Sequence, residues 1–114
     1  MAKVLLLGLE EVMTDQLARV LLEQDHEVSA EALPGRVPGY LEADVVFASQ
    51  EALFALKTAR PGQPFIVVTR LPEVDRWLDA LEAGATDYCA APFEHRQVRW
   101  LMDNALSRIH WAAA

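Results

Sequence analysis

The chain has 114 residues, of which 53% are hydrophobic and 24% are charged, and its formal net charge is −7. This length suits one domain with a single core, and the composition is that of a soluble globular protein. The apolar run that starts at Val4 stops at Gly8, too early for a membrane span or a signal peptide. The acidic excess disfavours nucleic-acid binding, which requires clustered Lys and Arg. We therefore expect a cytoplasmic protein that binds neither membranes nor nucleic acids.

Four runs of strand length occupy the first two thirds of the chain. Those at residues 3–8, 44–48 and 65–69 are almost continuously apolar, which predicts strands covered on both faces of a parallel sheet. The run at residues 26–30 has polar residues between its apolar ones and predicts an edge strand.

Helical patterns separate these runs. Residues 11–24 form an amphipathic pattern, and residues 49–60 contain good helix formers ahead of a Pro-Gly pair. Residues 31–43 contain two prolines and two glycines, which allow at most a short helical turn at residues 38–42. A further helix begins near Pro72. The apolar stripes consist of Met13, Leu17, Val20 and Leu21 in the first helix, and of Val74, Trp77, Leu78 and Leu81 in the helix after Pro72.

The stretch from residue 81 to residue 93 reads Leu-Glu-Ala-Gly-Ala-Thr-Asp-Tyr-Cys-Ala-Ala-Pro-Phe. Its glycine, Gly84, is typical of a helix C-terminus. Residues 88–91 are apolar enough for a buried strand, which Pro92 ends because proline has no N–H for a sheet ladder. A last helix follows from residue 94 towards residue 109.

The alternation of strands and helices predicts an α/β fold, a doubly wound five-stranded parallel sheet with helices on both faces. We expect one domain at residues 1–111 and an unstructured tail at residues 112–114.

The order of a helix end, Gly-Ala-x-x-Tyr-x-x-Ala-Pro-Phe and a final helix resembles the last third of response-regulator receiver domains. The resemblance implies the flavodoxin-like receiver fold and a place in bacterial two-component or phosphorelay signalling, as the N-terminal part of a larger regulator. In that family, two acidic residues after the first strand hold magnesium and an aspartate after the third strand accepts the phosphoryl group. A hydroxyl residue follows the fourth strand, and a lysine follows the fifth.

The family positions carry over to Gly8 and Leu9, Ser49, Thr69 and Ala91, in chain order. All four charged positions are therefore lost, whereas the hydroxyl residue, Thr69, and the aromatic that moves with it, Tyr88, are retained as switch-like residues. Without metal ligands and lysine, nothing neutralises the charge on a transferring phosphoryl group. We expect a pseudo-receiver, not an enzyme, with no metal or other cofactor.

These residues also have simpler interpretations. Ser49 is expected to cap the helix that follows it, Thr69 fits a turn or capping position, and Tyr88 fits a buried aromatic whose hydroxyl reaches the surface. An alternative function is a small-molecule site, in which Gly8, Ser49 and Thr69 form a neutral pocket.

Cys89 lies in an apolar run and is expected to be a buried filler. The three histidines are expected on the surface.

The last helix suggests where a partner protein binds. Its helical periodicity turns Val98, Leu101, Met102, Ala105 and Ile109 towards the sheet. Trp100 and Trp111 then point outwards, and exposed tryptophans near arginines such as Arg96 favour an interface. The resemblance implies that the fourth helix, fifth strand and fifth helix form this surface, with Trp77 and Tyr88 contributing. The expected partner is another protein or a second copy of the chain.

Overall fold

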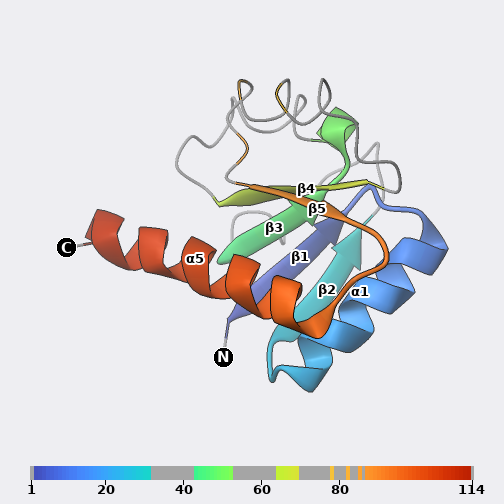
Figure 1. Cartoon of the computed structure of the whole chain (residues 1–114), viewed down its shortest axis with the longest axis horizontal. Coiled ribbons are helices and arrows are strands. Elements are labelled where there is room, and N and C mark those ends of the chain that lie inside the picture. The colour runs from blue at the N-terminus through green and yellow to red at the C-terminus, as the bar shows by residue number, and fades with distance from the viewer. Residues whose placement is uncertain are drawn as a thin grey trace.

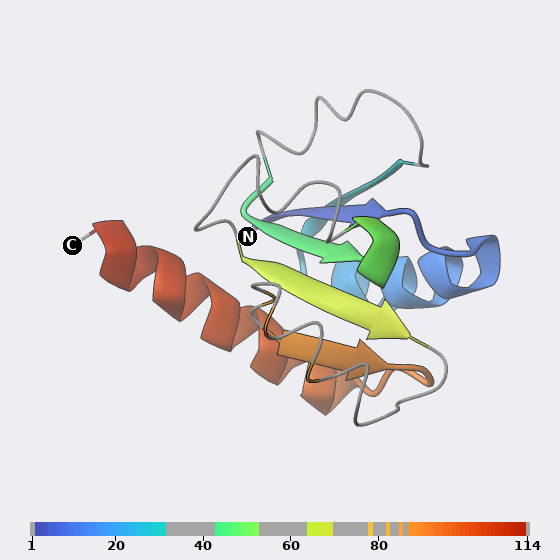
Figure 2. The ribbon, with the colours of Figure 1, turned by 90° about the horizontal axis from the view of Figure 1, so that it is seen from above.

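The computed structural model describes residues 2–31, 43–52, 64–69, 78, 82, 85 and 87–113, with side chains described as far as residue 107. The predicted helical segments at residues 38–42, at 53–60 and around Pro72 lie mostly outside these residues. Five strands form one sheet (Figures 1 and 2). They are β1 (Lys3–Leu7), β2 (Glu27–Glu31), β3 (Val45–Ala48), β4 (Phe65–Thr69) and β5 (Asp87–Ala90).

The sheet has the strand order β2-β1-β3-β4-β5, and every neighbouring pair is parallel. The chain first moves from β1 outwards to β2 and then returns to the other side of β1 to form β3. The strand order therefore reverses between β1 and β3, and such a switch point opens a crevice at the carboxyl ends of the strands. The predicted doubly wound five-stranded fold is confirmed.

Two helices, α1 (Glu11–Glu23) and α5 (His95–Ala113), cover one face of the sheet (Figure 1). Their apolar stripes meet alternate side chains of the strands, because successive strand residues point to opposite faces. This core contains Met13, Leu17, Val20 and Leu21 from α1, Val98, Leu101, Met102 and Ala105 from α5, and Val4, Leu6, Val45, Phe47, Ile66, Val68 and Cys89 from the strands. The predicted stripes of both helices are confirmed wherever their side chains are described.

The other alternate set of strand side chains forms a second buried cluster. Its members are Leu5, Leu7, Val46, Ala48, Phe65 and Val67, together with Ala52 from the helical segment that begins at Gln50. The strands β1, β3 and β4 are thus apolar on both faces. This explains why their sequences are continuous apolar runs rather than alternating ones.

Polar contacts join the end of α1 to the start of α5. The Gln24 side-chain amide donates a hydrogen bond from Nε2 to the carbonyl oxygen of His95, at 2.9 Å. The His95 Nε2 also lies within hydrogen-bond distance of a Glu23 carboxylate oxygen. These contacts connect residues more than 70 positions apart and fix how the two helices lie side by side.

Some predicted bounds and exposures differ from the structure. The helix α5 continues to Ala113, so residues 112 and 113, predicted as tail, are helical. Alanine is the strongest helix former, and no Gly or Pro stops the helix. Leu78, predicted on a buried stripe, is 49% exposed. It lies at the edge of that stripe by helical periodicity.

No helix in the described part of the chain is long and apolar enough to cross a bilayer.

Candidate functional site

The residues predicted to mark the vestigial phosphorylation site follow the strands at the carboxyl edge of the sheet. The backbone N–H of Ser49 donates a hydrogen bond to the carbonyl oxygen of Leu7 at 3.2 Å, which ties the end of β3 to the end of β1. The N–H of Ala91 likewise donates to the carbonyl oxygen of Thr69 at 2.9 Å and ties β5 to β4. Because β1, β3, β4 and β5 are consecutive neighbours, the fold brings these positions to one edge.

After β1, neither Gly8 nor Leu9 can bind a cation through a side-chain carboxylate. Gly8 has φ 69°, in the left-handed region, where a residue without Cβ is not strained. Its N–H donates to the carbonyl oxygen of Glu31 at 3.0 Å. Leu9 is partly buried and packs against the core beneath α1 and α5. Leu9 therefore has a packing role where the receiver pattern has an acidic side chain.

Ser49, at the phosphoacceptor position, serves as a helix cap. Its Oγ accepts a hydrogen bond from the backbone N–H of Ala52 at 3.2 Å, three residues into the following helical segment. This is the standard contact of an N-cap serine, which satisfies one of the free N–H groups of the first turn. The capping role predicted for Ser49 is confirmed.

Thr69 and Tyr88 stand on the adjacent strands β4 and β5. Thr69 is the last residue of β4 and is partly buried. Tyr88 pairs with Val67 across the ladder, and its ring packs against the second buried cluster. The Tyr88 hydroxyl oxygen has less than 1 Å² of accessible surface and no hydrogen-bond partner among the described residues. The hydroxyl was predicted to reach the surface, and this prediction is wrong because the ring lies inwards.

Ala91 occupies the lysine position and precedes Pro92 through a cis peptide bond. Its methyl side chain supplies no positive charge to this edge. Among the described residues, no group of three or more His, Cys, Asp or Glu side chains is placed to hold a metal ion. Cys89 is fully buried, and burial, with a smaller effect from Asp87, raises the pKa of its thiol to about 12. The predicted filler role of Cys89 agrees with this environment.

Two surface hollows whose lining residues are described lie away from Gly8, Ser49 and Thr69. One lies on the outer side of α1, and the other borders β2 near Lys3 and Ala43. The neutral small-molecule pocket considered from the sequence therefore has no support from these hollows. The Ser49 hydroxyl, which that pocket would use, also accepts the capping hydrogen bond from Ala52.

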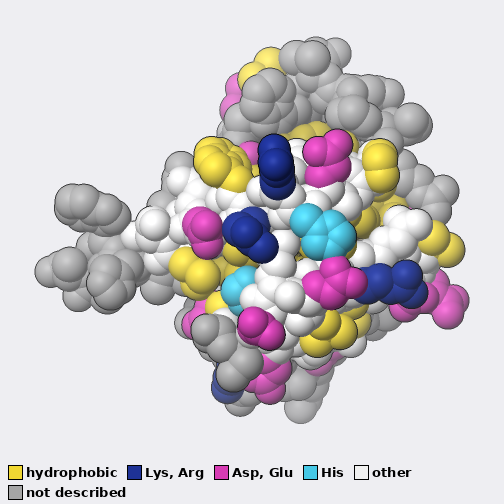
Figure 3. All heavy atoms as spheres, turned by 60° about the horizontal axis from the view of Figure 1, so that its bottom comes forward, with side chains coloured by type: hydrophobic (Ala, Val, Ile, Leu, Met, Phe, Trp, Pro, Cys, Tyr) yellow, Lys and Arg dark blue, Asp and Glu magenta, His cyan; other side chains and the backbone are white. Residues whose placement is uncertain are grey.

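The outer side of α5 carries the predicted interface residues. Trp100 is 60% exposed, and Arg96 is exposed one turn before it. Figure 3 shows the face formed by α1 and α5, where apolar, acidic and basic side chains are interspersed. Trp77 and the Trp111 side chain lie outside the described residues. Tyr88 belongs to the cluster on the opposite face of the sheet from α5, so its side chain does not extend the Trp100 surface.

Sequence reasoning missed three features of this face. His95 and Gln24 form the contact between α1 and α5, although the histidines were expected as isolated surface residues. No local sequence signal could reveal a contact across such a separation. His26 is also partly buried, and its Nδ1 accepts a hydrogen bond from the Ala2 N–H at 3.3 Å. Val12 and Leu22 are exposed on α1, and their position off the buried stripe was the available signal.

The geometry of this chain has close matches among solved structures. A response regulator receiver domain protein from Clostridium thermocellum superposes with a TM-score of 0.82 at 20% sequence identity, covering 98% of this chain and 99% of that one. The chemotaxis protein CheY4 of Vibrio cholerae superposes with a TM-score of 0.76 at 18% identity, covering 92% and 98%. The chain has the receiver-domain fold of response regulators.

A sequence relative agrees with this receiver fold. The chain is 30% identical over 94 residues to the DNA-binding transcriptional regulator NtrC of Klebsiella pneumoniae. The match covers 80% of this chain and 20% of NtrC, so the chain spans only about a fifth of that relative's length. No family model matches the sequence. The receiver resemblance inferred from residues 84–93 is thus confirmed at the level of the fold, which is found in regulators of signal transduction.

Proposed function

We propose that this receiver-fold domain is a pseudo-receiver, a module that binds another protein without being phosphorylated. The observation that carries the proposal is the chemistry of the carboxyl edge. Where the receiver pattern has acidic side chains, a phosphoacceptor aspartate and a lysine, this chain has Gly8, Leu9, Ser49 and Ala91. Receiver domains generally are not enzymes. We propose that this one, in addition, does not transfer a phosphoryl group to its own side chains.

The physical argument concerns charge. A phosphoryl group in transfer spreads negative charge over its oxygens, and receivers neutralise it with a magnesium ion and a lysine. Here Leu9 is partly buried against the core, and the Ser49 hydroxyl accepts a helix-capping hydrogen bond. A serine also cannot form the acyl phosphate that an aspartate forms. The surface would therefore signal through its constant shape rather than through a phosphorylation-dependent change.

The chemistry can be tested with the native chain. The chain is incubated with magnesium and acetyl phosphate, and separately with magnesium and beryllofluoride, and then analysed by intact mass spectrometry and sedimentation equilibrium. We expect neither a phosphoryl adduct nor a change in the sedimenting mass. A receiver domain that phosphorylates itself under the same conditions serves as the reaction control. An adduct, or a mass that responds to beryllofluoride, would contradict the proposal.

We propose that the interaction surface includes the outer side of α5. Trp100 supports this because a large aromatic side chain with 60% exposure, flanked by the exposed Arg96, is typical of an interface centre. The partner is a second copy of the chain or another cytoplasmic signalling protein. Trp100→Ala should weaken that association and leave the far-UV circular dichroism unchanged. Gln97→Ala, an exposed position on the same helix, is the matched control. Association that is equal in both variants would refute this surface.

A further inference from the structure

The outer side of α1 carries a stripe of exposed residues that is apolar at both ends and charged in its middle. Val12 and Leu22 are 56% and 57% exposed, although both are large apolar residues. Asp15 and Arg19 lie between them and are also exposed. The spacing 12, 15, 19, 22 is the alternating three-and-four spacing of a helix–helix contact seam. This stripe faces away from the core residues Leu17 and Leu21, so it is separate from the face that holds α1 on the sheet.

The stripe is its own complement when two copies run antiparallel. In an antiparallel pair centred on residue 17, the numbers of two residues that face each other add up to 34. Val12 then faces the partner's Leu22, and Asp15 faces the partner's Arg19. Apolar meets apolar at both ends of the seam, and opposite charges meet twice in its middle. A two-fold axis requires this self-complementarity of the contacting patch.

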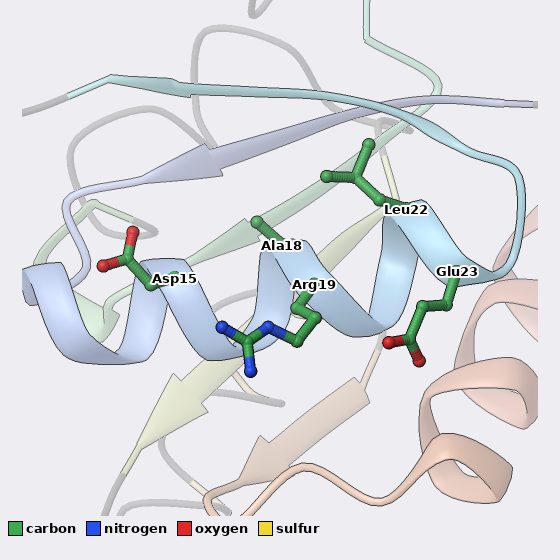
Figure 4. Close-up of a pocket in the computed structure, with 5 residues that line it drawn as sticks. All are labelled: Asp15, Ala18, Arg19, Leu22 and Glu23. Atoms are coloured by element: carbon green, nitrogen blue, oxygen red, sulfur yellow. The ribbon is translucent and has the colours of Figure 1, made fainter.

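The shape of the surface agrees with this pairing. A hollow on α1 is lined by Asp15, Ala18, Arg19 and Leu22, with Glu23 at its border (Figure 4). The first four stand at positions i, i+3, i+4 and i+7, which is the four-residue hole that receives a side chain from a facing helix. The small Ala18 side chain leaves the hollow open. Figure 4 shows the Asp15 carboxylate and the Arg19 guanidinium pointing apart rather than towards each other.

We propose that the outer face of α1 is a self-association surface, on which two copies of this chain pack their α1 helices antiparallel about residue 17. The centre of the hole lies between residues 18 and 19. Because the numbers of facing residues add up to 34, the partner's Asp15 enters this hole and lies against Arg19. This proposal goes beyond the function proposed above, because it uses neither the carboxyl edge of the sheet nor the Trp100 surface.

The expected strength follows from the size of the contact. A helix of 13 residues is roughly 20 Å long and about 10 Å wide, so its footprint is a few hundred Å². Stable complexes bury roughly 800 Å² on each partner. The contact is smaller than that of stable complexes, so the association is weak. Its measurement requires a high protein concentration and about 0.15 M salt, which screens the repulsion between two chains of net charge −7.

Charge reversal tests the pairing. Sedimentation equilibrium up to about 1 mM should show reversible dimers of the native chain. Asp15→Arg places like charges opposite each other twice, as does Arg19→Asp, and each should lower the association constant at least about tenfold. The double variant Asp15→Arg/Arg19→Asp restores both opposite-charge pairs and should recover association to within about threefold.

A matched control tests whether a change in net charge alone alters the association. Glu27→Arg makes the same acidic-to-basic change at an exposed position on β2 and should leave the association unchanged or slightly stronger. Circular dichroism confirms that each variant is folded. A monomeric native chain up to about 1 mM would overturn the proposal. It would also be overturned by dimers that tolerate the single reversals, or by single losses that the double variant does not repair.

Discussion

Replacing Tyr88 by phenylalanine should stabilise this protein. The Tyr88 hydroxyl oxygen has less than 1 Å² of accessible surface and no hydrogen-bond partner among the described residues. Burying a hydroxyl without a partner costs about 1–3 kcal/mol in protein substitution data. We use the lower end because the residue as a whole is only partly buried. The free energy of unfolding of Tyr88→Phe should therefore rise by about 1 kcal/mol.

Urea denaturation followed by circular dichroism measures this change. With a slope of about 1–2 kcal/mol per molar urea for a chain of this size, the midpoint should rise by about 0.5–1 M, and the melting temperature by about 4 °C. The companion variant Tyr88→Ala also removes the ring that packs against the second buried cluster. It should lower the free energy of unfolding by about 2 kcal/mol, below the cost of truncating a fully buried aromatic. The pair separates the hydroxyl from the ring.

The result that would refute this reasoning is a destabilised Tyr88→Phe variant with an unchanged slope. It would mean that the hydroxyl is hydrogen-bonded in solution and that the ring occupies another position. That outcome would return Tyr88 to the mobile, switch-like role suggested by its place in the receiver pattern. Stabilisation would instead support a fixed inward ring.

Three further predictions concern backbone, pH and thiol chemistry. Gly8→Ala should lower the free energy of unfolding by about 1 kcal/mol because φ is 69° there, and Gly8→Asn should lower it less; equal losses in thermal melts would refute the backbone explanation. Burial lowers the pKa of His26 in the folded chain below its ordinary value of 6.5. As the pH falls below 6.5, the unfolded chain therefore binds a proton before the folded chain does. The folded state loses stability until the pH is below the folded pKa. His26→Asn, which can still accept the Ala2 N–H, should flatten this part of a urea-measured pH profile, and an unchanged profile would contradict the assignment. With its pKa raised to about 12, the Cys89 thiol should resist an aromatic disulfide reagent at pH 8 until urea unfolds the chain; rapid labelling of the native chain would show that the site opens.

Much of the fold could be predicted because the strands are buried on both faces. A strand such as β4, whose first four residues are all buried, must be apolar throughout, and such runs are visible in sequence. The edge strand β2 was located to within one residue, although only part of it is covered. The vestigial positions could be found by counting from the strand ends, because Gly8 and Ser49 directly follow β1 and β3.

Side-chain environments at the site were less predictable. The Ser49 cap is a contact within four residues, so the sequence was sufficient to predict it. The direction of the Tyr88 ring depends on how β5 packs beside β4 and on the second buried cluster, which is formed by distant segments. Its hydroxyl was therefore placed at the surface in error.

The sequence by itself determined the order of strands and helices, the core-facing sides of α1 and α5, and the loss of charged residues at the carboxyl edge. These features depend on residue type and on spacing within one element. Only the tertiary structure decided that Glu23 and Gln24 meet His95 and that Val12 and Leu22 stay uncovered on α1. Periodicity identifies an apolar face, but what covers a side chain is set by the packing of elements far apart in the chain.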